Sequence, residues 1–417
     1  MNQVLLSKKL VYFLVFYVLF CGFAIKNLNA SKSILFVIDV VYIVLFLRGN
    51  FRIKAAGLRF PLFILCLILI NALIGILLND GIIGNFLWGI RNQYLSCVLL
   101  LASASFLCIN DIKKIFKFFF YFQFLNLGCA IYQYTILGYW GDDNNGAFVN
   151  GGGQDIFCGI LVTYYLYRYV RHECKLWQFI FILLSSLLIA AIEEEKFIFI
   201  ETAFIFFYFF LTGKIGLRNV FIALVFFVIM FFSLGTLADI GGENSLEILT
   251  DKEAFMEYQE NAYELPRIGS SEILEQMFFK EENQYYWGLG LGMCEESSTL
   301  DFINDDFYRR YGWLNYSWFT FHINFLQTGW VGIVLFLSFF VSILWSNIKN
   351  KKRAPQKLKY LYDVSNIIVI LCVMTIWYNA TLRSYNTLIP FFALSLGMIV
   401  SRWVKENSKN VPSSLQR

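Results

Sequence analysis

Residues 60–79 read FPLFILCLILINALIGILLN, a run of twenty positions without one charged side chain. A helix needs about 20 apolar residues to cross the hydrocarbon core of a bilayer, so this stretch has the length and composition of a membrane span. The run is continuously apolar rather than alternating, which favours a helix over a barrel strand, and a helix satisfies its own backbone in lipid. The stretch therefore predicts a transmembrane helix.

Similar apolar runs recur along the whole chain of 417 residues. The sequence is 58% hydrophobic and only 15% charged, whereas roughly a quarter of the residues in a soluble domain are charged. We expect an all-α polytopic membrane protein with about twelve transmembrane helices. Their expected bounds are 10–25, 33–48, 60–79, 83–107, 115–137, 155–169, 177–192, 197–212, 219–238, 321–345, 363–379 and 387–404.

The spans divide the chain into three parts. Residues 1–238 would hold the first nine helices, residues 239–320 a large loop with short helices, and residues 321–417 the last three helices and a tail. The short connections carry 24 Lys and Arg residues on one side of the membrane and 4 on the other. Because cytoplasmic loops carry the excess, both termini are predicted to be cytoplasmic and the large loop extracytoplasmic.

The charges and cysteines exclude several classes of protein. The net charge of +4 does not indicate a nucleic-acid partner, and the distribution of the charges is more informative than their sum. The nine cysteines lie mostly in apolar runs, and no pair has metal-ligand spacing, so neither a disulfide framework nor a metal site is predicted.

The large loop has its own expected organisation. An amphipathic helix is predicted over Ser270–Glu282, with Ser270 or Ser271 as its N-cap. A glycine-rich turn follows at Gly288–Gly292, and an aromatic stretch runs from residue 308 to 321.

Four cations on the predicted outer half are candidates for binding a ligand, because charges at membrane depth are costly. Arg91 lies inside the fourth span, Lys196 in the turn after the seventh, Arg267 in the large loop and Arg383 before the last span. Together they can hold a polyanion such as a lipid-linked pyrophosphate. The simpler interpretation pairs Arg91 with a buried carboxylate and Lys196 with neighbouring glutamates, and leaves Arg267 in solvent.

His322 is the candidate catalytic base. It opens the tenth span at the predicted outer surface, and histidine can take a proton from an attacking hydroxyl near neutral pH. The alternative is an ordinary residue of the interfacial belt.

Candidate sugar-binding groups lie in two outer segments. In the loop 138–155, Asp142 and Asn150 can bond sugar hydroxyls and Trp140 can pack on a sugar face, although an ordinary flexible loop is the alternative. Trp313 in the aromatic stretch can stack in the same way, while interfacial belts of Trp and Tyr explain most of that stretch.

The order of these motifs resembles the O-antigen polymerase and O-antigen ligase superfamily of bacterial membrane glycosyltransferases. The matching pieces are Gly146-Ala-Phe-Val-Asn150, the turn at Lys196, Arg267 followed by Gly288–Gly292, and His322 followed by Phe325-Leu326 and Gly329–Gly332.

The resemblance implies a metal-independent, inverting glycosyl transfer without a cofactor, on the outer side of the bacterial cytoplasmic membrane. The donor would be an undecaprenyl-pyrophosphate-linked oligosaccharide, and the product an O-antigen, capsule or exopolysaccharide polymer. His322 would act as the base, and Lys196 and Arg267 would bind the donor pyrophosphate, with Arg91 and Arg383 as weaker candidates. The implied partners are the lipid-linked glycan, membrane lipid, a chain-length regulator and a flippase.

Two alternatives stay open. An O-antigen ligase would use the same donor and transfer the glycan to a lipid or protein acceptor. A polysaccharide transporter or flippase would also have about twelve spans with cytoplasmic termini.

Overall fold

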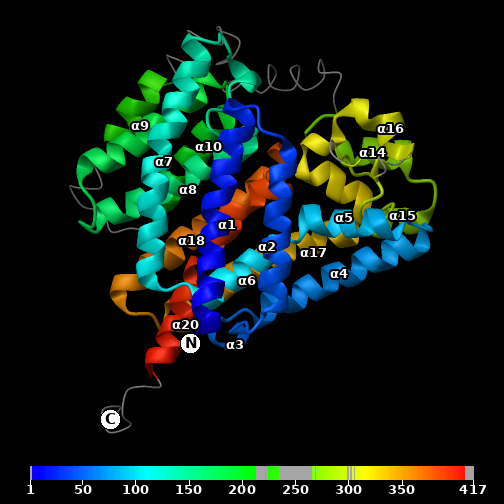
Figure 1. The fold of residues 1–417 in the computed structure, drawn as a ribbon, viewed down its shortest axis with the longest axis horizontal. Coiled ribbons are helices and arrows are strands. Elements are labelled where there is room, and N and C mark those ends of the chain that lie inside the picture. The colour runs from blue at the N-terminus through cyan, green and yellow to red at the C-terminus, as the bar shows by residue number, and fades with distance from the viewer. Residues whose placement is uncertain are drawn as a thin grey trace. The chain divides into compact units, whose positions relative to one another are not determined.

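The computed structural model describes residues 2–212, 221, 224–233, 265–267, 269–297, 300, 303–304 and 306–408 (Figure 1). Throughout these residues the chain forms α-helices and short 3-10 turns, and no strand occurs in them. The expected all-α class is confirmed. The first part of the predicted large loop, residues 239–264, lies outside the described residues.

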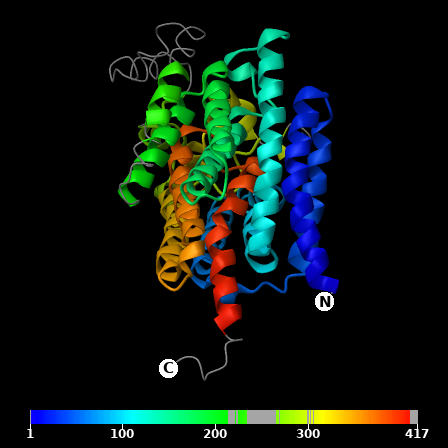
Figure 2. The ribbon, with the colours of Figure 1, turned by 90° about the vertical axis from the view of Figure 1, so that its left-hand side faces the viewer.

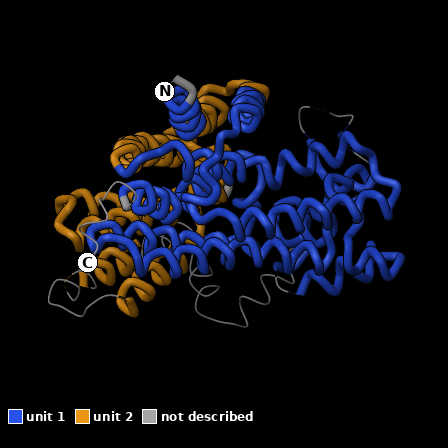
Figure 3. Tube along the Cα trace, turned by 90° about the horizontal axis from the view of Figure 1, so that it is seen from below, with its two compact units in different colours: residues 1–15, 35–109, 259–417 blue, residues 16–34, 110–258 orange. Residues whose placement is uncertain are grey.

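The chain forms two compact units (Figure 3). Unit 1 comprises residues 1–15, 35–109 and 259–417, and unit 2 comprises residues 16–34 and 110–258.

Unit 2 is a bundle of α7 (Ile109–Thr135), α8 (Gly151–Val170), α9 (Leu176–Ile192) and α10 (Lys196–Thr212), joined by the second half of α1 (Asn2–Asn27). Helices α8, α9 and α10 pack against one another (Figure 2). Stacked aromatic rings join α7 to α8, with 3.6 Å between the ring centroids of Phe116 and Tyr164.

Unit 1 is built around α4 (Arg59–Leu78), α17 (Thr320–Lys351) and α18 (Lys359–Tyr378), because α17 lies along both of the others. Short helices from the large loop pack at one end of α4 and α17 (Figure 1). The remaining helices of this unit are α2 (Phe36–Leu47), α3 (Ile53–Ala56), α5 (Ile83–Gln93), α6 (Cys97–Phe106), α14 (Ser270–Phe278), α15 (Glu282–Trp287), α16 (Asp306–Tyr311), α19 (Leu388–Leu394) and α20 (Leu396–Ser408).

Six helical segments among the described residues are long and apolar enough to cross a membrane, which fits a membrane protein. They are Val4–Asn27, Arg59–Leu78, Ile109–Thr135, Thr320–Lys351, Gln356–Tyr378 and Ser384–Asn407. The other described spans match shorter helices, so the expected number of twelve is not established by helix length. Both α9 and α10, for example, have 17 residues.

Several predicted helices are interrupted. The span expected at 83–107 is two helices, α5 and α6, and the span expected at 387–404 is α19 and α20. The helix expected at Ser270–Glu282 ends at Phe278, because Phe279 is extended, and Gly269 rather than a serine occupies its N-cap. In α17, Gly329 takes a non-helical conformation with φ of 59°.

Candidate functional site

The beginning of α17 is fastened to the end of α18. The backbone N–H of Thr320 and its side-chain hydroxyl both donate to the carbonyl of Asn379, at 3.0 and 2.9 Å. One residue further along α17, the ring of Phe321 stacks on Trp377 with 5.7 Å between centroids. These contacts fix the position of Phe319, the N-cap residue of α17, and that of Tyr378, the last residue of α18.

Arg267 lies against these two rings. Its guanidinium carbon is 4.5 Å from the ring centroid of Tyr378 and 5.6 Å from that of Phe319. Cation–π contacts of this kind contribute about 0.5–2 kcal/mol each. Within the described ranges no carboxylate pairs with Arg267, and the neighbours of its guanidinium there are the aromatic rings of Phe319 and Tyr378.

His322 is the neighbour of Arg267 and is fully buried. Its ring centroid is 4.6 Å from that of Phe319. Neither ring nitrogen has a hydrogen-bond partner in the described part of the chain. The carbonyl of Pro266 faces the imidazole but does not meet hydrogen-bond geometry. Arg267, Phe319, His322 and Tyr378 form what we call the Arg267–His322 site.

A second polar cluster in unit 1, the Glu295 network, surrounds a buried carboxylate. One guanidinium nitrogen of Arg383 is 2.6 Å from both carboxylate oxygens of Glu295. The amides of Asn92 and Gln327 donate to the same carboxylate at 2.7 and 3.0 Å. Gln93 in turn donates to Gln327 at 2.7 Å. The carboxylate of Glu295 is therefore fully satisfied, and the charge of Arg383 is compensated.

The Glu295 network is joined to the Arg267–His322 site through the backbone. Arg383 donates from its other terminal nitrogen to the carbonyl of Ser317 at 3.2 Å, two residues before Phe319. Sequence reasoning singled out Arg383 but not Glu295, because a single acid in an acidic loop carries no distinguishing signal. The pairing of Arg383 with Glu295 exists only once the loop has folded onto the helices.

Arg91 is also neutralised. Its Nε atom donates to Asp39 at 2.9 Å, and its guanidinium lies 4.2 Å from the ring centroid of Trp88 and 4.9 Å from that of Tyr385. This matches the simpler interpretation, in which Arg91 pairs with a buried carboxylate.

The glycine-rich turn closes the break in α17. Because Gly329 leaves the helical conformation, the carbonyls of Leu326 and Gln327 lose their helical partners. They accept hydrogen bonds from the backbone N–H groups of Leu289 and Gly290, at 2.7 and 3.1 Å. The turn therefore satisfies buried backbone carbonyls that lack their helical partners.

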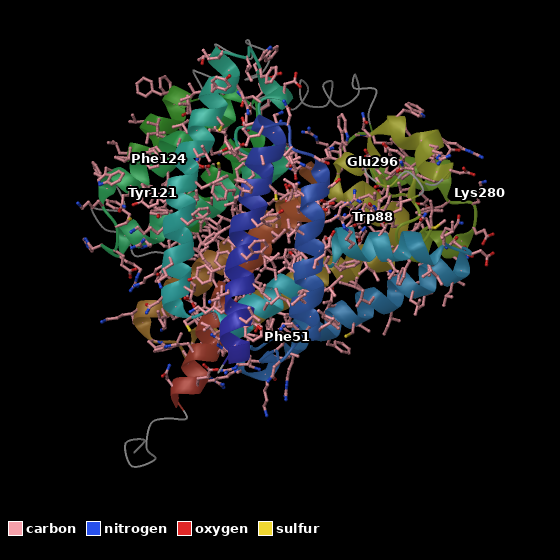
Figure 4. All side chains as sticks on the ribbon, in the orientation of Figure 1. Phe51, Trp88, Tyr121, Phe124, Lys280 and Glu296 are labelled. Atoms are coloured by element: carbon pink, nitrogen blue, oxygen red, sulfur yellow. The ribbon has the colours of Figure 1, made fainter. Side chains whose placement is uncertain are left out.

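The glycines of this turn approach neighbouring backbones too closely for a side chain. A Cβ atom on Gly292 would lie 1.8 Å from the carbonyl oxygen of Asn85, and one on Gly288 would lie 2.4 Å from the backbone of Gln327. The segment that follows the turn contacts α5, where the indole N–H of Trp88 donates to the Glu296 carbonyl at 3.4 Å (Figure 4). The motif thus holds the loop, and with it Glu295, against the helices.

Lys196 belongs to unit 2, where it begins α10. Its ammonium is 3.6 Å from the carboxylate of Glu194, in a tight turn in which Glu194 has a φ of 57°. The other three candidate cations, Arg91, Arg267 and Arg383, belong to unit 1.

The candidate sugar-binding residues have different surroundings. Asn150 is the N-cap of α8 and accepts a hydrogen bond from the N–H of Gly153 at 3.2 Å. Trp140 and Trp313 are exposed, by 56% and 66%, so their ring faces are accessible for stacking. The side chain of Asp142 lies outside the described residues.

Neither a scan against models of protein families nor a search of curated proteins finds a match for this chain.

Proposed function

We propose that the chain is a membrane glycosyltransferase that polymerises undecaprenyl-pyrophosphate-linked oligosaccharide units on the outer side of the bacterial cytoplasmic membrane. In this proposal the chain has twelve spans, both termini are cytoplasmic, and a flippase and a chain-length regulator work beside it. The observation that carries the proposal is the pairing of an arginine lacking a described acidic partner with an uncommitted, buried histidine, Arg267 and His322.

The chemistry of this pair suits an inverting transfer from a pyrophosphate leaving group. A phosphate ligand competes poorly for an arginine that already holds a carboxylate, which disfavours Arg91 and Arg383 as primary ligands. Arg267 can stabilise the charge that develops on the leaving pyrophosphate. An imidazole nitrogen of His322 can accept the proton of the acceptor hydroxyl. Because His322 is fully buried, residues around it must move to admit the acceptor, and Pro266 and Phe319 are among its neighbours.

Two other assignments use the same observations differently. A ligase would use this donor chemistry with a lipid or protein acceptor. A transporter is the second candidate function, favoured by the break in α17 at Gly329, because transporters use interrupted membrane helices at their binding sites.

Deletion of the gene and complementation with variants tests the proposal. The deletion strain should retain single repeat units on its surface glycan and lose the ladder of longer chains on a gel. Arg267→Ala and His322→Ala should fail to restore the ladder, and Arg267→Lys should restore it partly, since lysine keeps the charge but not the bidentate geometry.

The matched control is Arg310→Ala, which removes a cation from the same loop. Arg310 is 70% exposed and lies 3.9 Å from Asp306, so its loss should leave the ladder intact. A full ladder in both Arg267→Ala and His322→Ala would exclude the mechanism. Loss of all surface glycan with accumulation of lipid-linked polymer would identify a ligase, and accumulation of repeat units on the cytoplasmic side would identify a transporter.

A further inference from the structure

Unit 2 contains a group of carboxylates that the proposed glycosyl transfer does not use. Asp155 is on α8, Glu193 and Glu195 are in the turn between α9 and α10, and Glu201 is on α10. Asp155 and Glu201 are fully buried, and Glu193 is 1% exposed. Asp155 repels each of the three glutamates, and Glu195 also repels Glu201, so the four carboxyl groups are electrostatic neighbours.

Glu201 is the member of this group to which no described residue donates a hydrogen bond. Both of its carboxylate oxygens are buried, and neither accepts a hydrogen bond from a described residue. The nearby donors are engaged elsewhere: the amide of Gln154 donates to Glu193 at 2.6 Å, and the Lys196 ammonium is 3.6 Å from Glu194. Around Glu201, α10 contributes buried apolar side chains such as Ile198 and Ile205.

Among the described residues, the titratable groups of this region are mostly acidic. They are Asp155 and Cys158 on α8, Glu193, Glu194 and Glu195 in the turn before α10, and Lys196 at the start of α10. The facing side chains of α7 and α9, Gln123 and Ser185, are neutral and bond each other at 3.1 Å. With Glu201 itself, the described part of this region therefore contains five acids and one lysine.

A buried carboxylate without donors, next to other carboxylates, is strongly unfavourable when ionised. A cation or a proton must reduce this charge. Among the described residues, no three His, Cys, Asp and Glu side chains are arranged to hold a metal ion, which favours the proton. We propose that Asp155, Glu193, Glu195 and Glu201 form a proton-binding site, with a proton held on Glu201 at neutral pH.

Infrared spectroscopy of the full-length protein in lipid nanodiscs tests this site directly, because a protonated carboxylic acid has a carbonyl stretch that a carboxylate lacks. Wild type at neutral pH should show this band, and the band should weaken in Glu201→Gln. The control variant Glu194→Gln, whose side chain is 24% exposed and pairs with Lys196, should leave the band unchanged. An unaltered band in Glu201→Gln, or no band in wild type, would overturn the proposal.

Thermal unfolding gives a second readout. The folded chain keeps a proton on Glu201 that the unfolded chain releases at neutral pH, so the melting temperature of wild type should fall as pH rises. Glutamine resembles the protonated acid, so Glu201→Gln should melt at or above wild type at neutral pH, with a flatter pH dependence.

Two outcomes of the melting experiment would contradict the site. One is a Glu201→Gln variant that melts lower than wild type with an unchanged pH slope, which would mean that Glu201 is an ionised, partnered group. The other is stabilisation of wild type, but not of Glu201→Gln, by added NaCl or CaCl2 at constant pH and ionic strength, which would identify a metal cation as the ligand. If Glu201→Gln does not fold, Asp155→Asn serves in both measurements, with the same expected weakening of the band.

Discussion

Arg383 and Glu295 are 88 positions apart in the sequence and 2.6 Å apart in the folded chain. The same relation holds for Arg91 and Asp39, which are 52 positions apart. Sequence reasoning recognised both arginines as unusual, because charges at membrane depth are rare, but the partner of each depends on tertiary structure. Arg267 differs because its neighbours are the rings of Phe319 and Tyr378, and this difference separates a ligand-binding candidate from two structural ion pairs.

Removal of Glu295 should destabilise the protein strongly. Glu295→Ala leaves the buried guanidinium of Arg383 without a counter-charge, which typically costs about 3–5 kcal/mol. Melting temperatures in detergent micelles, followed by tryptophan fluorescence, provide the measurement. Glu296→Ala is the control, because the Glu296 side chain is exposed and neighbours Tyr308 rather than Arg383, while its backbone carbonyl binds Trp88. Equal melting temperatures for the two variants would show that the Glu295 network contributes little to stability.

Asn150 has a structural role that can be separated from sugar binding. As the N-cap of α8 it can be replaced by Ser, which also caps, whereas Ala removes the acceptor for Gly153 and should cost about 0.5–2 kcal/mol. We expect Asn150→Ser to retain both stability and surface glycan. A stable Asn150→Ser protein that makes no ladder would show that the amide itself contacts the sugar.

At the scale of elements, apolar runs predicted where helices occur but not where they break. The run 60–79 became α4 almost without change, since nothing in it competes with helical hydrogen bonding. The breaks after α5 and within α17 contain no proline, and so give no local signal of interruption. At Gly329 the interruption is stabilised from outside, by the N–H groups of Leu289 and Gly290.

The glycine-rich turn should not tolerate side chains. Gly292→Ala places a methyl group 1.8 Å from the Asn85 carbonyl oxygen and requires alanine at φ of 89°, so we expect a loss of at least about 2 kcal/mol in stability. Gly84→Ala on α5 is the matched control, because a Cβ atom there meets nothing within 4 Å. In a helix that control should be neutral or stabilising by up to about 1 kcal/mol. Thermal unfolding of both variants provides the measurement. Similar melting temperatures for the two variants would contradict the close packing around Gly292.

At the scale of the whole molecule, the Lys and Arg asymmetry predicts which segments lie on which side of the membrane. Trp313 is exposed in the segment predicted to be outside, and Lys352 is exposed in one predicted to be inside. A membrane-impermeant maleimide applied to intact cells should label Trp313→Cys, and should label Lys352→Cys only after the cells are opened. Both variants are made in a protein in which the accessible native cysteines are replaced by serine. These are Cys66, Cys108, Cys129 and Cys174.

Labelling of both positions in intact cells, or of Lys352→Cys alone, would contradict the predicted orientation. Prior treatment with an impermeant thiol-blocking reagent should prevent labelling of Trp313→Cys, and a cytoplasmic thiol protein that stays unlabelled serves as the control for cell integrity.

The break in α17 also has a consequence for biosynthesis. The carbonyls of Leu326 and Gln327 lack helical partners until Leu289 and Gly290 reach them, and each such group would cost several kcal/mol if α17 crosses the hydrocarbon region as predicted. Synthesis from the N-terminus delivers α4, α5 and the glycine-rich turn before α17 leaves the ribosome. The turn can therefore act as a template on which α17 adopts its bent form, with assembly of this region proceeding from the loop toward the helix.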